Sequence, residues 1–90
     1  MDSSQKLQVQ IFTPQKTILK DHVSLCLGAP GVEGFFEVLP GHAPFATQLE
    51  KGTVKVQGEG KVLSYKTSGG FLRVQSDVVT LLLDDAEDVR

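Results

Sequence analysis

The stretch TVKVQ-GEG-KVLSY, residues 53–65, decides the fold of this chain. Polar and apolar residues alternate in its first part, which places Val54 and Val56 on one face of a strand. Three residues then follow, Gly58–Gly60, and a glycine-containing connection of this length is typical of a β-hairpin. The stretch therefore predicts two antiparallel strands, with Val54 facing a core.

Short segments of the same kind lie on both sides of this hairpin. Turn residues separate them, and the two prolines at positions 40 and 44 rule out a helix there. Because a single sheet could not cover its own apolar face, the pattern predicts one all-β domain over residues 1–85, an antiparallel β-sandwich or flattened barrel. The further strands are predicted at Leu7–Ile11, Val23–Leu27, Phe35–Leu39, Phe71–Gln75 and Val78–Leu83.

Composition excludes several classes of protein. Hydrophobic residues make up 40% of the 90 residues and charged residues 22%, which is typical of a chain that folds. A formal net charge of −2 provides no basic surface for nucleic acid. One cysteine and two histidines cannot form an internal disulfide or a structural zinc site. There is no apolar stretch of about 20 residues, and the first residues do not resemble a signal peptide.

The C-terminal segment changes character. Asp84 is a good helix N-cap, Glu87 lies three residues later, and further acidic residues favour the positive end of a helix dipole. Residues 86–90 are therefore predicted to begin a helix that is cut short, and a solvated acidic tail is the equally weighted alternative.

Catalytic patterns are weak in this sequence. It contains no phosphate-binding glycine motif, and Cys26 lies in a strand pattern where a free cysteine is usually a buried apolar group. Glu33 and Glu37 could form an acid–base pair, but solvated loop carboxylates are the better interpretation. The segment Gly34–Phe45 is aromatic and stiffened by its prolines, which suits either recognition or a rigid corner between sheets.

An ordered set of short motifs spans nearly the whole chain. These are Gly34, Leu39–Pro44 (LPGHAP), Leu49, Gly52, Ser68–Phe71 (SGGF) and Asp85–Glu87, with the opening Leu7–Val9 leading to Thr13–Pro14. In these motifs and their order, the chain resembles the epsilon subunit of the rotary ATP synthases.

The resemblance implies a ten-stranded β-sandwich. Family members usually continue into a C-terminal helical hairpin, and this hairpin is expected to be absent here. It implies a non-catalytic subunit of the central stalk, without a cofactor, that docks on the gamma subunit and the ring of c subunits and transmits rotation to ATP synthesis. The expected location is peripheral to the membrane, at the cytoplasmic face of a bacterial inner membrane. A β-sandwich adaptor in another complex is the alternative, and the isolated chain is expected to be a monomer or a weak dimer.

Individual positions match the family's contact residues. The positions expected to bind gamma are Thr13, Pro40, Gly41, His42, Ala43, Pro44 and Thr47. The positions expected to face the c ring are Phe35 and Phe36. Phe35 stands where many members have a glutamate, so the ring contact is expected to be apolar here. Glu37 stands where they usually have glycine, so the corner is expected to have another backbone shape.

Overall fold

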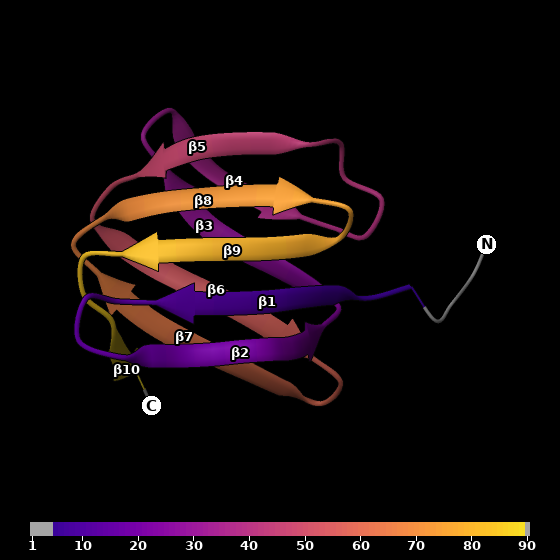
Figure 1. Cartoon of the computed structure of the whole chain (residues 1–90), viewed down its shortest axis with the longest axis horizontal. Helices are drawn as coiled ribbons and strands as arrows, with labels where there is room; N and C mark the ends of the chain where they lie inside the picture. The colour runs from indigo at the N-terminus through magenta and orange to yellow at the C-terminus, as the bar shows by residue number, and fades with distance from the viewer. Residues whose placement is uncertain (1–4, 90) are drawn as a thin grey trace.

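The computed structural model describes residues 5–89, which contain ten strands and no helix. Figure 1 shows the strands arranged in two layers around one core. The strands are β1 (Leu7–Phe12), β2 (Thr17–Ser24), β3 (Cys26–Gly31), β4 (Gly34–Val38), β5 (Phe45–Leu49), β6 (Gly52–Gly58), β7 (Lys61–Thr67), β8 (Gly70–Gln75), β9 (Val78–Leu83) and β10 (Glu87–Val89).

The ten strands form one sheet that curls on itself. Its order is β10-β7-β6-β3-β5-β8-β9-β1-β2, and β4 pairs with β3 beside this path. In Figure 1, β5, β8, β9, β1 and β2 make the front layer, and β4, β3, β6 and β7 lie behind them. The predicted all-β sandwich is confirmed, as is the number of strands that the family resemblance implies. It is antiparallel except for one pair, because β1 runs parallel to its neighbour β9.

The core lies between the two layers, and the hairpin β6–β7 contributes to it as predicted. Val54 pairs with Tyr65, and the Val54 side chain is completely buried. The opening strand also alternates as expected, because Leu7, Val9 and Ile11 all face inward. The largest completely buried side chains are Leu7, Ile11, Leu27, Leu72, Leu81, Leu83, Val9, Val38, Val54, Val56, Val74 and Val79.

The prediction of one strand at Val23–Leu27 is wrong, because the chain passes from β2 to β3 within this segment. The pairing of β1 with β2 shifts between Val9 and Ile11, and Asp21 in this region has a φ of 52°, as in a β-bulge. Beyond this irregularity Val23 points outward and Ser24 inward. Cys26 is half-buried rather than part of the core, and its thiol donates to Gln57 Oε1 at 3.6 Å.

The predicted helix start after Asp84 is also wrong, since residues 87–89 form β10 and pair with β7. Asp85 provides the physical reason. Its Oδ1 accepts hydrogen bonds from Ser68 N at 2.8 Å and Ser68 Oγ at 3.1 Å. A carboxylate that was expected near a helix N-terminus therefore stabilises the turn between β7 and β8, and the chain continues along the edge of β7.

Candidate functional site

The loop Leu39–Pro44 joins β4 to β5 and forms a tight turn. His42 N donates to Leu39 O at 3.1 Å, and Gly41 has a φ of 86°. Proline second and a positive-φ glycine third are the residues that a type II turn favours. Gly41 N donates to Asp77 Oδ1 at 2.8 Å, which ties the loop to the hairpin β8–β9. The predicted rigidity of this loop thus has a local and a long-range cause.

Three aromatic rings lie close together at the loop, those of Phe36, His42 and Phe45. The Phe36 and Phe45 ring centroids are 5.5 Å apart at an interplanar angle of 73°, an edge-to-face arrangement. The His42 ring lies 5.6 Å from Phe45. Phe36 is half-buried and packs against the core, so it anchors the loop more than it presents a free surface.

Phe35 points the opposite way from Phe36. Its side chain is 61% exposed, and its ring lies over Gly28 of the paired strand β3. A Cβ atom at Gly28 would be 2.6 Å from that ring, so the glycine makes room for the phenylalanine. The structure therefore separates the two residues that were predicted together as facing the c ring.

The two threonines predicted to bind gamma lie apart. Thr13 follows the C-terminal end of β1, whereas the loop Leu39–Pro44 leads into the N-terminal end of β5. Because β1 and β5 run in the same direction, Thr13 and the loop lie at opposite ends of the front layer (Figure 1). Thr13 Oγ1 donates to Lys16 O at 3.1 Å within the turn to β2. Thr47 is half-buried in β5 and pairs with Leu72 of β8.

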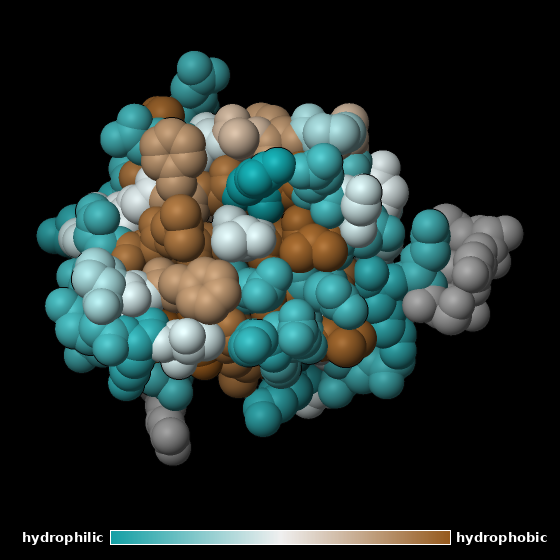
Figure 2. Space-filling model, viewed as in Figure 1, coloured by the Kyte–Doolittle hydropathy of each residue, from teal (hydrophilic) through white to brown (hydrophobic). Residues whose placement is uncertain are grey.

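An apolar stripe, formed by Phe12, Leu82 and Phe71, crosses the outer face of the front layer. Leu82 pairs with Phe12 on one side and with Phe71 on the other. Leu82 is 57% exposed and Phe71 53% exposed. Figure 2 shows apolar side chains gathered at the end of the front layer where β1 and β9 finish, at the left of the view, with polar residues around them. This stripe was not predicted from the sequence, although the outward direction of Phe71 follows once Leu72 is placed in the core.

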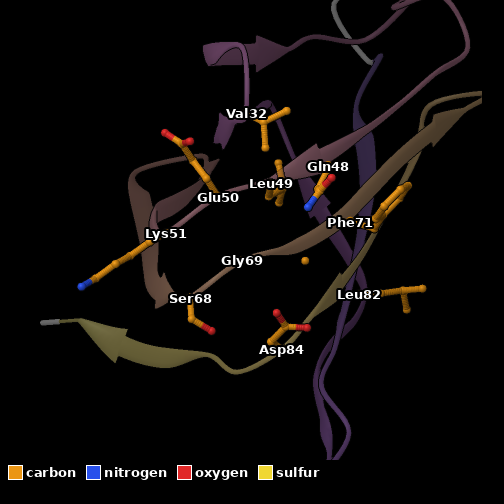
Figure 3. A pocket seen from close by; sticks show the side chains of 11 residues that line it. Val32, Gln48, Leu49, Glu50, Lys51, Ser68, Gly69, Phe71, Leu82 and Asp84 are labelled. Carbon is orange, nitrogen blue, oxygen red and sulfur yellow. The ribbon is translucent and has the colours of Figure 1, made fainter.

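A hollow of about 590 Å³ lies next to the stripe, between the ends of β5, β8 and β9. Its charged side chains do not converge, since Glu50 and Lys51 extend away from one another (Figure 3). Glu33 and Glu37 are both exposed, so neither is desolvated as an acid–base pair requires. Within residues 5–89 no three acidic, histidine or cysteine side chains are grouped as metal ligands.

Two pKa shifts belong to the contacts of the C-terminal segment. The Ser68 N–H holds the pKa of Asp85 below its ordinary 3.8, and the hydroxyls of Ser68 and Thr67 add to the effect. Burial raises the pKa of Tyr65 above its ordinary 10.0, and the negative charge of Asp88 raises it further. Asp85 ties the segment before β10 to the turn after β7, and Tyr65 lies on β7 opposite Asp88 of β10.

Comparison with known proteins points to one family. A family model described as "ATP synthase, Delta/Epsilon chain, beta-sandwich domain" matches residues 6–89. The ATP synthase epsilon chain of Pelotomaculum thermopropionicum is 43% identical over 86 residues, which are 96% of this chain and 62% of the relative. That of Carboxydothermus hydrogenoformans is 39% identical over 82 residues, 91% of this chain and 60% of the relative. The chain thus spans about three fifths of the length of these curated relatives.

Solved structures give the same result. A chain in the Euglena gracilis mitochondrial ATP synthase, in a structure of its OSCP, F1 and c-ring, aligns with a TM-score of 0.90 at 28% identity. The alignment covers 98% of this chain and 56% of that one. A chain of the central stalk and c-ring of the Tetrahymena thermophila enzyme aligns with a TM-score of 0.78 at 21% identity, over 97% of this chain and 69% of that one, which supports the fold.

No helix in the described residues is long and apolar enough to cross a membrane.

Proposed function

Because the chain belongs to the β-sandwich family of ATP synthase delta and epsilon chains, we propose that it is a non-catalytic subunit of the enzyme's rotor. In this role it docks on the gamma subunit and on the ring of c subunits, at the cytoplasmic face of the membrane. Ion flow turns the ring, and the chain helps to fasten gamma to the ring so that rotation drives ATP synthesis on other subunits. It needs no cofactor for this mechanical role.

The pre-ordered loop Leu39–Pro44 is the observation that carries the proposal. The Asp77–Gly41 hydrogen bond and the rings of Phe36 and Phe45 hold the loop in one arrangement. A loop that is ordered before binding loses less conformational entropy when it docks. Its prolines add to this effect by restricting the backbone of the free chain.

The outer face of the front layer is the proposed surface for gamma. The loop, with Pro40 to Pro44, lies at one end of this layer, and Thr13 lies at the other. Thr13 directly follows Phe12, so the apolar stripe continues the surface from the threonine toward β8. Thr47 lies on β5 in the same layer, but it pairs with the buried Leu72, so its side chain is on the inner face and is not part of this surface. Exposed apolar area rimmed by polar residues is typical of protein–protein contact sites.

The proposed surface for the c ring lies around Phe35, on β4 in the other layer. Its exposed ring makes this contact apolar, and Phe36 contributes from beneath by holding β4 and the loop together. Each elementary charge that crosses the membrane releases about 2.3 kcal/mol per 100 mV, and the joint must transmit this work without slipping. A curled sheet whose neighbouring strands are paired from β10 to β2 provides the required stiffness.

Binding to the purified gamma subunit of the same organism tests the proposal. Leu82→Ser changes an exposed residue of the apolar stripe, and His42→Ala changes a half-buried residue of the loop. Val62→Ser is the matched control on the outer face of β7, because Val62 is 55% exposed. If either surface residue is a hot spot, its substitution weakens binding by about 2 kcal/mol, whereas the control binds like the unchanged chain. Equal affinities for all three variants would place the interface elsewhere. A folded chain without any affinity for gamma would favour an adaptor role in another complex.

A further inference from the structure

The tip of the hairpin β8–β9 has an unusual sequence for its geometry. Gln75 pairs with Val78, so only Ser76 and Asp77 form the connection, and their φ angles are 51° and 63°. Two-residue hairpin turns with positive φ at both positions favour Asn-Gly or Asp-Gly. Here neither residue is glycine, although L-residues adopt this conformation at a cost. Glycine would suit the turn better at position 77, so the Asp77 side chain is expected to serve a purpose outside the turn.

Asp77 makes two hydrogen bonds to segments outside its own hairpin. Its main-chain carbonyl accepts from Gln8 N at 2.9 Å, at the start of β1. Its carboxylate Oδ1 accepts from Gly41 N at 2.8 Å. Any residue could supply the carbonyl, but only an acceptor side chain can supply the second bond. A glycine at position 77 would suit the turn and would leave Gly41 without this partner.

The backbone N–H of Gly41 is a donor through which the position of the loop can be fixed. The turn's own hydrogen bond joins His42 N to Leu39 O, and the Gly41 N–H takes no part in it. Asp77 uses this donor from 36 residues away in the sequence. The anchored glycine directly precedes His42, whose ring is in contact with Phe45. The hydrogen bond therefore sets where the turn stands relative to the front layer.

We propose that Asp77 is a positioning residue that orders the loop Leu39–Pro44 for docking, an inference that rests on the proposed function of this loop. Asp77 acts through Gly41 and requires no contact with the partner. It reduces the number of loop conformations in the free chain, so less order has to be created at the moment of binding.

Three single variants separate this role from a general effect on stability. Asp77→Gly removes the acceptor and at the same time relieves the positive φ. Asp77→Asn keeps an oxygen acceptor, and asparagine tolerates this backbone conformation. Ser76→Gly is the matched control, because it relieves the neighbouring positive φ and leaves the Asp77–Gly41 bond intact. For each variant, the measurements are the urea midpoint, hydrogen exchange of the Gly41 amide by NMR, and affinity for gamma.

Asp77→Gly is expected to unfold at the same or a higher urea concentration, to lose protection of the Gly41 amide, and to bind gamma about tenfold more weakly. Asp77→Asn and Ser76→Gly are expected to stay within about twofold of the unchanged chain in affinity. If Asp77→Gly binds as tightly as the unchanged chain, the proposal is wrong. It is also wrong if Asp77→Asn loses affinity while its Gly41 amide stays protected, since the charge would then contact the partner directly.

The exchange measurement keeps this inference distinct from the proposed function. If the unchanged chain does not bind gamma, the proposed function fails and docking cannot be the purpose of the Asp77 contact. Protection of the Gly41 amide in Asp77→Asn, and its loss in Asp77→Gly, would then still show that Asp77 orders the loop. Equal protection in both variants would overturn that part as well.

Discussion

Replacing Gly70 by alanine should destabilise the fold strongly, because Gly70 has no room for a side chain. It is the first residue of β8 and pairs with Leu83 of β9 and Leu49 of β5. A Cβ atom there would lie 2.2 Å from the Leu82 carbonyl oxygen and 2.8 Å from Leu83 Cα. Both neighbours are backbone atoms, so no rotamer change can relieve the clash.

The cost has two parts. Relieving the contact requires β9 to move by roughly 1 Å, and overpacking of this kind costs about 1–3 kcal/mol. The φ of Gly70 is 152°, and forcing another residue into such a glycine region costs about 1–3 kcal/mol more. Together these give about 4 kcal/mol, against a total stability of roughly 5–13 kcal/mol for a chain of this length.

Urea unfolding followed by circular dichroism measures the effect, and Gly60→Ala is the matched control. Gly60 also has a positive φ, at 70°, but a Cβ atom there would meet nothing within 4 Å. The control should therefore lose only the backbone part, about 1 kcal/mol. With a slope of about 1–2 kcal/mol per molar urea, Gly70→Ala should lower the midpoint by about 2–4 M. A midpoint no lower than that of Gly60→Ala would refute the reasoning.

Three further predictions concern the core and the C-terminal segment. Val54→Asp buries an unpaired charge and should leave the chain unfolded at 25 °C by circular dichroism. The control Val62→Asp, on an exposed site, should fold. A folded Val54→Asp would show that the strand register is wrong. Asp85 has a lowered pKa in the folded chain, so its contribution to stability is present above pH 3.8 and is lost as the pH falls through the folded pKa. Asp85→Asn should melt at a lower temperature at pH 7, and its melting temperature should fall less steeply in acid. The same fall in acid as in the unchanged chain would contradict this. Tyr65 has a raised pKa in the folded chain, so its contribution to stability is present below pH 10.0 and is lost as the pH rises through the folded pKa. Tyr65→Phe should remove part of the loss of stability at alkaline pH. Identical melting curves of the two chains at alkaline pH would contradict this.

The local pattern of polar and apolar residues was sufficient to predict a strand where that strand has one buried face. The hairpin around Gly58–Gly60 and the strand beginning at Leu7 follow directly from alternation and turn chemistry. The strand Phe45–Leu49 was not predicted from the residues, because its middle, Ala-Thr-Gln, has no apolar alternation. The corner after Ser24 depends on an irregularity near Asp21, and such an irregularity reverses which residues face inward.

The candidate site could also be predicted only in part from the sequence. Pro40 and Pro44 reveal a stiff loop, but its anchor on Asp77 is a contact between residues far apart in the sequence. The same holds for Asp85, whose partner Ser68 is what turns an expected helix start into a strand. The apolar stripe was missed because Val78–Leu83 is apolar on both faces, so its pattern alone does not show that Leu82 points outward.

Titration calorimetry of this chain into the purified gamma subunit, with light scattering on the mixture, tests the central claim most directly. The rotor assignment predicts a one-to-one complex of micromolar affinity or better, which corresponds to about −8 kcal/mol. A folded chain that shows no heat of binding and no complex by light scattering would contradict the claim that this β-sandwich docks on gamma.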